Sequence, residues 1–211
     1  MTGAHPVVTD GADETRVSGE WGGGVSPFRV SWAKLMMWLF LLSDTLTFAG
    51  LLSGYGYSRL SSPSWPASHE VFNLNLVGLM TFILICSSAT MAMAVTAAKS
   101  ERWADAVRFV GLTILGGLVF LGMQAYEWSH FIGEGARLSG NPWGAPLFSA
   151  SFFVITGFHG LHVTAGVVYL ATVLARSARR RYTADGVEVA GLYWHFVDLV
   201  WVFIFTLLYL I

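Results

Sequence analysis

Charged side chains are scarce in this chain. Asp, Glu, Lys and Arg make up 12% of its 211 residues, about half of the roughly 25% found in soluble domains. Hydrophobic residues reach 55%, and the mean hydropathy is +0.59. This composition excludes an ordinary soluble protein and predicts an integral membrane protein. The few basic residues form no cluster of the kind that binds nucleic acid.

Cysteine and the common cofactor motifs are also missing. The one cysteine, Cys86, falls in an apolar run, which excludes a disulfide within the chain and a cysteine metal cluster. The sequence has no phosphate-binding glycine loop, no Rossmann glycine pattern and no serine or cysteine nucleophile constellation. Residues 1–27 are Gly-rich and acidic and lack the apolar core of a signal peptide, so we expect 1–30 to form a disordered tail.

Long apolar runs fill the rest of the chain. A bilayer core needs about 20 apolar residues of helix, and five stretches in 31–211 reach that length. They predict an all-α membrane domain with spans at about 35–57, 72–97, 104–131, 146–175 and 190–211. No internal repeat of the kind found in many transporters is visible.

Basic residues are distributed unevenly between the two sides of these spans. Of the twelve Lys and Arg residues, ten lie in or beside the N-terminal tail and the second and fourth loops, which leaves only Arg59 and Arg137 for the first and third loops. By the positive-inside rule this predicts a cytoplasmic N-terminus and a C-terminus on the outside. The run Arg179, Arg180 and Arg181 is expected to meet anionic lipid headgroups.

Small residues recur inside the spans and predict close contacts between helices. These glycines are Gly50, Gly54, Gly116, Gly117, Gly157, Gly160 and Gly166.

Ionisable and amide side chains inside the spans are the candidate functional residues, because placing them in hydrocarbon is costly. They are Asp44, Gln124, Glu127, His159, His162, His195 and Asp198. All but Asp44 form pairs three residues apart, so that each pair shares a helix face. The rise of a helix, about 1.5 Å per residue, places Asp44, His195 and Asp198 in the cytoplasmic half. Glu127 then approaches the outer boundary.

Each of these residues has a structural and a functional interpretation. Asp44 is expected to be partnered or neutral, and Glu127 is either a buried acid or an interfacial acid reached by water. His159 and His162 are too few for a metal site, which needs three or four ligands. Histidines in such a position more often form hydrogen bonds between helices, and we expect this role for both. His195 and Asp198 form either a polar clamp between helices or a proton relay.

Four segments together resemble the subunit III family of the haem–copper respiratory oxidases. Residues 38–50 contain Leu-Leu-Ser-Asp-Thr-Leu-Thr-Phe, and 123–128 read Met-Gln-Ala-Tyr-Glu-Trp. Residues 156–164 read Thr-Gly-Phe-His-Gly-Leu-His-Val-Thr, and 193–201 read Tyr-Trp-His-Phe-Val-Asp-Leu-Val-Trp. The resemblance covers 35–211. Asp44 stands where many family members have Glu, although relatives that oxidise quinol also have Asp.

Two departures from the family pattern are visible. Longer members have seven helices, of which the first two help to form a lipid-filled cleft; this chain lacks those two helices, like bacterial five-helix forms. The loop at 140–145 also lacks the usual acidic residue.

The resemblance implies a non-redox subunit of a proton-pumping terminal oxidase in a bacterial cytoplasmic membrane. Haems and copper would belong to subunit I and electron entry to subunit II, so we expect no haem, copper or other metal in this chain. Subunit III would contact subunit I, bind phospholipid and support proton uptake. A cytochrome c oxidase, a quinol oxidase and an accessory role in nitric oxide reduction stay open. An independent proton-coupled transporter using Glu127, His159 and His162 is the alternative from another class.

Overall fold

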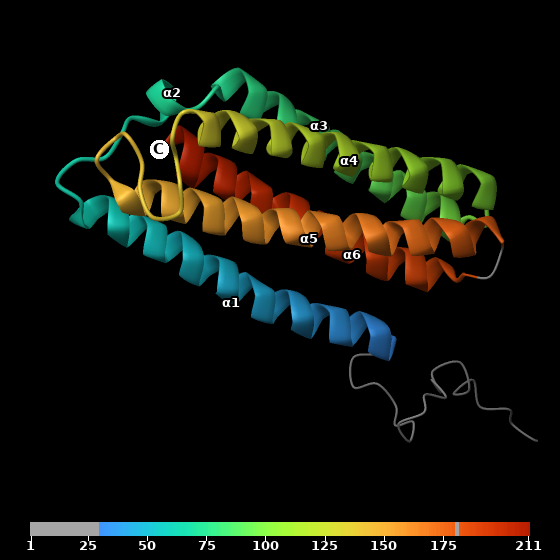
Figure 1. Ribbon diagram of the computed structural model, residues 1–211. Helices are drawn as coiled ribbons and strands as arrows, with labels where there is room; N and C mark the ends of the chain where they lie inside the picture. Colours follow the sequence, from blue (N-terminus) through green and yellow to red (C-terminus); the bar gives the residue numbers. More distant parts are fainter. Residues whose placement is uncertain (1–29, 180–181) are drawn as a thin grey trace, which may run out of the picture.

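The computed structural model describes residues 30–179 and 182–211, and Figure 1 shows them as a bundle of long helices. Its elements are α1 (Trp32–Ser61), α2 (Ser68–Val71), α3 (Leu74–Lys99), α4 (Trp103–Gly133), α5 (Pro146–Ala178), α6 (Ala184–Ile204) and the π-helical turn η2 (Phe205–Leu210). Within these residues there is no β-strand, and α1, α3, α4, α5 and the joined α6 and η2 are long and apolar enough to cross a membrane. The predicted all-α architecture of five membrane-spanning helices is confirmed. Nearly all of the predicted disordered tail lies outside the described residues.

Several helices begin at side-chain caps that the sequence supplies. The Ser31 hydroxyl accepts from the Lys34 N–H at 3.4 Å, Asn73 accepts from Leu76 at 3.2 Å, and Thr183 accepts from Gly186 at 3.1 Å. The cap at Thr183 starts α6 six residues before the predicted span at 190. The predicted span began too late because two acidic residues, Asp185 and Glu188, are typical of a loop. In the structure both lie in α6 and form ion pairs with lysines.

α6 lies at the centre of the bundle and contacts α1, α3 and α5. Glycines on the neighbouring helices allow this close approach: a Cβ on Gly117 would lie 2.6 Å from the Trp194 ring, and one on Gly166 would lie 3.0 Å from it. Gly116 similarly brings α4 against Ser87 of α3. Gly50 and Gly54 are different, because nothing lies within 4 Å of a Cβ built at either position. The close contact predicted from the glycines therefore fails for α1 within this chain.

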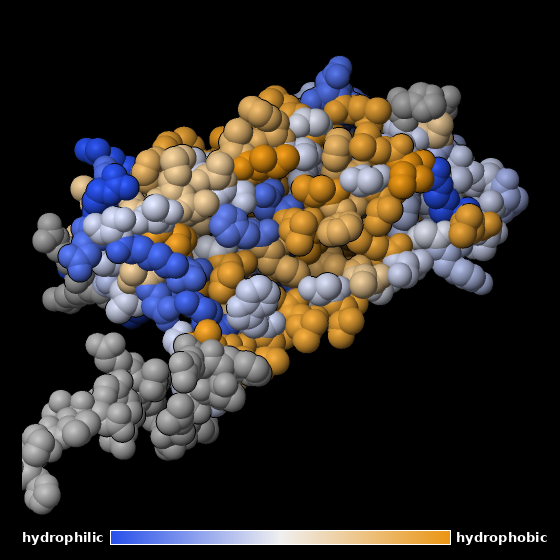
Figure 2. All heavy atoms as spheres, turned by 180° about the vertical axis from the view of Figure 1, so that it is seen from behind, coloured by the Kyte–Doolittle hydropathy of each residue, from blue (hydrophilic) through white to orange (hydrophobic). Residues whose placement is uncertain are grey.

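α1 is the outermost helix. In Figure 1 it runs at an angle beneath α5, along the edge of the bundle. Only 17% of the most apolar 18-residue stretch of α1 is buried, whereas 50% of the corresponding stretch in α6 and η2 is buried. Figure 2 shows apolar side chains over most of the middle of the bundle and hydrophilic ones gathered at its ends. This distribution is what a membrane-embedded bundle requires.

Candidate functional site

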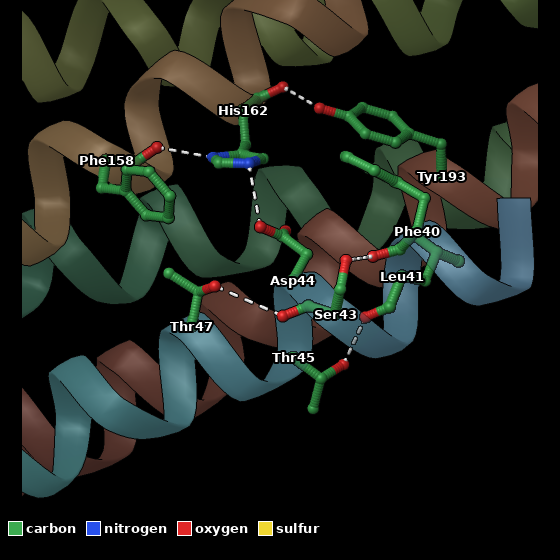
Figure 3. A network of polar contacts seen from close by, with 9 residues as sticks. All are labelled: Phe40, Leu41, Ser43, Asp44, Thr45, Thr47, Phe158, His162 and Tyr193. Carbon is green, nitrogen blue, oxygen red and sulfur yellow. Dashed lines mark hydrogen bonds and ion pairs between the residues drawn. The ribbon is translucent and has the colours of Figure 1, made fainter.

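Asp44 on α1 faces His162 on α5, as Figure 3 shows. The Oδ1 atom of Asp44 lies 3.3 Å from Nε2 of His162, and Asp44 is only 7% exposed. Nδ1 of His162 is held by the Phe158 carbonyl at 2.8 Å, and the Tyr193 hydroxyl donates to the His162 carbonyl at 3.0 Å. The sequence identified both residues but did not pair them, since they lie on helices far apart in the chain.

The hydrogen bonds determine how this pair can carry a proton. Because a carbonyl only accepts, Nδ1 of His162 must carry a hydrogen. One further proton then lies between Nε2 of His162 and Oδ1 of Asp44. On the nitrogen it gives an imidazolium–carboxylate pair, and on the oxygen it gives two neutral groups. The pair has no net charge in either form, which makes it compatible with its membrane-spanning position.

His195 and Asp198 on α6 meet at a third residue, Ser88 of α3. The Ser88 hydroxyl lies 2.6 Å from Nδ1 of His195 and also interacts with the Asp198 carboxyl. Oδ1 of Asp198 has no partner among the described residues. A histidine, a hydroxyl and a carboxyl in series can clamp two helices and can also pass a proton. Sequence reasoning missed Ser88, because a serine inside an apolar run gives no signal of its own.

His159 lies in the centre of the aromatic core. It is fully buried, and its ring packs against Phe48, Phe120 and Trp201 with centroid distances of 6.4, 5.8 and 5.2 Å. Neither ring nitrogen has a hydrogen-bond partner among the described residues. The predicted interhelical hydrogen bond of His159 is therefore not formed within the described chain.

Gln124 and Glu127 share a face of α4 as predicted but contact different partners. The Gln124 side-chain amide donates to the Thr156 carbonyl of α5 at 2.7 Å. One oxygen of Glu127, Oε2, accepts from the Tyr209 hydroxyl of η2 at 2.9 Å. Glu127 is 7% exposed, which places it in the interior rather than at an open interface.

A charged cluster that the sequence did not predict joins the N-terminal ends of α1 and α6 to the C-terminal end of α3. Lys34 of α1 lies 3.0 Å from Asp185 and 3.1 Å from Glu188 of α6. Lys99 of α3 also reaches Glu188, at 3.0 Å. At the other end of α1, the Arg59 guanidinium donates to the backbone carbonyl of Ile211. Of the predicted headgroup-binding arginines, Arg179 is exposed after α5, and Arg180 and Arg181 lie outside the described residues.

An apolar groove lies between α1 and α6. Its volume is about 550 Å³, and its walls are almost entirely hydrophobic. The α1 side includes Trp38, Leu42 and Phe48, and the α6 side includes His195 and Phe203. His195, held by Ser88 from behind, is the one ionisable side chain in this wall. Such a groove is suited to a long apolar ligand with at most one polar contact.

Among the described residues, no three His, Cys, Asp or Glu side chains lie close enough together to hold a metal ion. The polar residues instead form pairs and short chains that connect helices. Their arrangement can position helices and hold protons, and it offers no nucleophile with an adjacent base.

Comparison with known proteins agrees with the motifs. The family model described as cytochrome c oxidase subunit III matches residues 13–211. The chain is 38% identical to cytochrome c oxidase subunit 3 of Bacillus subtilis, over 83% of this chain and 84% of that protein. It is 39% identical to cytochrome c oxidase subunit 3 of a Synechocystis species, over 82% and 73% of the two chains.

A relative from a quinol oxidase is nearly as similar. Identity to the cytochrome bo(3) ubiquinol oxidase subunit 3 of Pseudomonas aeruginosa is 34%, over 82% of each chain. The five apolar helices and these bacterial relatives identify a multi-pass bacterial membrane protein. Since the family model covers nearly the whole sequence, the chain belongs to the cytochrome c oxidase subunit III family.

Proposed function

We propose that this chain acts as the non-redox subunit III of a proton-pumping haem–copper terminal oxidase in a bacterial cytoplasmic membrane. The family match over residues 13–211 carries this proposal. The chain has no catalytic centre of its own and supports one in its partners. The Asp44–His162 pair and the His195–Ser88–Asp198 chain are consistent with a protein that holds helices and protons rather than redox centres.

The electron donor of the complex is proposed to be cytochrome c. Identities to two cytochrome c oxidase subunits are 38% and 39%, whereas a third cytochrome c oxidase subunit and a quinol oxidase subunit are each 35% identical. Quinol oxidase is the second candidate, and an accessory role in nitric oxide reduction is the third. A proton-coupled transporter is disfavoured because His159 and Glu127, which it would use, do not contact one another and lie in different surroundings.

We propose that the outward face of α1 contacts subunit I. α1 is the least buried membrane helix, and Gly50 and Gly54 leave open space on it. Small residues allow another helix to approach closely in a membrane. Contacts with subunit II are expected to be fewer. Cysteines placed at Gly50 and Gly54 should form cross-links to subunit I, whereas cysteines at lipid-facing Leu115 and Leu118 of α4 should not.

The groove between α1 and α6 is proposed to bind a phospholipid acyl chain. Its volume of about 550 Å³ and its hydrophobic walls suit hydrocarbon. Leu199 lines the groove, and Leu199→Trp should fill it and reduce the phospholipid that copurifies with the complex, measured by mass spectrometry of extracted lipid. The matched control is Leu161→Trp on the exposed side of α5. Equal phospholipid content in the wild type and both variants would show that the groove does not bind phospholipid.

The orientation of the chain follows the distribution of basic residues. We expect the N-terminus and the α3–α4 turn on the cytoplasmic side and the α1–α2 loop on the outside. After Cys86→Ser, single cysteines at Ser64 and Ser100, both exposed, should react with a membrane-impermeant thiol reagent from opposite sides. Reaction of both from the same side would contradict the orientation.

Support of proton uptake is tested at Asp44. In the purified complex, Asp44→Ala should leave the haem spectra unchanged, because no redox centre is proposed in this chain. We expect weaker retention of the subunit in detergent, and oxygen consumption that is slower and less durable at mildly alkaline pH, where protons limit turnover. Oxygen consumption should be followed over time at mildly acidic and mildly alkaline pH, with subunit content measured in the same samples. Wild-type behaviour in all of these would reduce Asp44 to a tolerated polar residue.

A further inference from the structure

A small pocket lies beside Glu127, where α4 meets the junction of α2 and α3. Its volume is about 100 Å³. Asn73 and Leu76 line it from the start of α3, and Tyr126, Glu127 and His130 line it from α4. A water molecule occupies roughly 30 Å³ of liquid, so the pocket has room for a few water molecules.

One carboxyl oxygen of Glu127 lacks a hydrogen-bond partner among the described residues. Oε2 accepts from Tyr209, but Oε1 is buried and has no partner among the described residues. No Lys or Arg of the described chain forms an ion pair with this carboxyl. A buried polar atom left unpaired is costly, and buried atoms of this kind are usually satisfied by ordered water. The pocket next to Glu127 can supply that water.

The local backbone holds Tyr209 in place to bond Oε2. Tyr209 belongs to η2, where the helix widens from α to π geometry, a change that often accompanies functional sites. Its ring packs against Phe72 with a centroid distance of 4.7 Å. With Tyr209 donating to Oε2, a proton on Glu127 would lie on Oε1, the oxygen that lacks a protein partner.

The pocket also reaches the surface. Its polar lining residues Asn73 and His130 are exposed, as is Tyr126. Glu127 lies six residues before the end of α4 at Gly133, which corresponds to about 9 Å along the helix. Water in the pocket therefore lies within a short distance of the aqueous phase at this end of the bundle, where the chain also ends (Figure 1).

We propose that this pocket is a hydration site in which water hydrogen-bonds Oε1 of Glu127 and exchanges the carboxyl proton with the aqueous phase at the C-terminal end of the bundle. The site is separate from the Asp44–His162 pair and goes beyond the proposed function. It uses only this chain's residues, and it makes Glu127 a proton-exchanging group on the side opposite the Lys34 cluster.

Infrared spectroscopy of the purified complex during exchange into D₂O tests the proposal. The protonated carboxyl band of Glu127 is assigned by its loss in Glu127→Gln. In the wild type we expect this band to shift within seconds. Leu76→Phe, which fills the pocket, should slow the shift roughly tenfold by displacing water. Leu79→Phe on the lipid-facing side of the same helix should leave it unchanged. A band that stays unshifted for many minutes, or a Glu127 that shows no protonated band, would overturn the proposal.

Radiolytic footprinting in ¹⁸O-labelled water gives a second measurement that needs no variant. Bound water labels the side chains beside it. Phe72 and Phe131 line the pocket and are 6% and 2% exposed, whereas the fully buried Phe120 lies in the interior core. We expect several-fold faster labelling of Phe72 and Phe131 than of Phe120. Equal labelling of all three would show a dry pocket and would contradict the proposal.

Discussion

The central helix α6 and the outer helix α1 are held in the bundle by different kinds of contact. α6 fits tightly against its neighbours, and its two tryptophans donate to α3: Trp194 to Ser87 at 3.0 Å and Trp201 to Thr81 at 2.9 Å. α1 buries little surface, and charged side chains connect it to the bundle at three levels, through Lys34, Asp44 and Arg59. Packing therefore holds the central helix α6 in place, and polar contacts hold the outer helix α1.

The bilayer explains this difference. Between helices in lipid there is no strong hydrophobic driving force, because the lipid tails are as apolar as the side chains. Dense packing between large side chains still gives dispersion energy, which α6 obtains on several sides. A helix on the edge gains less from packing, so its position depends more on the few hydrogen bonds and ion pairs that it makes.

The largest expected effect is the loss of packing in α6. Trp201 is fully buried and contacts Phe120, His159 and Tyr209 through its ring. Trp201→Ala should lower the free energy of unfolding by about 3 kcal/mol or more, as expected for a large aromatic core residue. The measurement is reversible unfolding of the purified chain in mixed micelles with an increasing fraction of denaturing detergent.

Phe203→Ala provides the control for this prediction. Phe203 lies two residues further along α6, is 54% exposed and lines the groove beside α1. Its loss should change the free energy of unfolding by about 0.5 kcal/mol or less. If the two substitutions had equal effects, packing would not distinguish the centre of the bundle from its surface.

The helices could be predicted from the sequence, but most contacts between them could not. Hydropathy located all five membrane helices, because an apolar run of sufficient length is a direct signal. The motif residues were found for the same reason, since ionisable groups stand out in apolar segments. Their partners depend on how each helix is rotated. A serine at 88 gives no such signal, and Asp185 was assigned to a loop because its partner Lys34 lies about 150 residues away in the chain.

Breaking the contact in the middle of α1 should have an intermediate effect. Asp44→Leu leaves Nε2 of the half-buried His162 without its partner. We expect a loss of about 1–2 kcal/mol in the free energy of unfolding, the upper range for polar contacts between membrane helices. Ser43→Leu is the matched control, because Ser43 is exposed and its hydroxyl bonds only to Phe40 within α1.

The partner variant shows whether this loss comes from the pair. Asp44→Leu combined with His162→Leu should be less destabilised than the sum of the two single variants, because no polar atom is then left unpaired. Strict additivity, measured in the same micelle titration, would mean that the two side chains act independently.

The smallest effect is expected at the charged end of α1. Lys34→Gln removes the cation that joins α1 to Asp185 and Glu188, while Lys99 still neutralises Glu188. The cost should be only about 0.5–1 kcal/mol, because ion pairs near water are screened and weak. The change should be visible locally: the distance distribution between spin labels at Ala33 and Ala184 should broaden at low salt. High salt should broaden the distance distribution of the wild type in the same way, because it screens the same charges.

The control for this prediction is Arg108→Gln. It removes a similar charge whose partner, Asp105, lies on the same helix, so it should leave the distribution unchanged. A narrow distribution in Lys34→Gln, or equal broadening in Arg108→Gln, would show that α1 is not positioned by its ion pairs with α6.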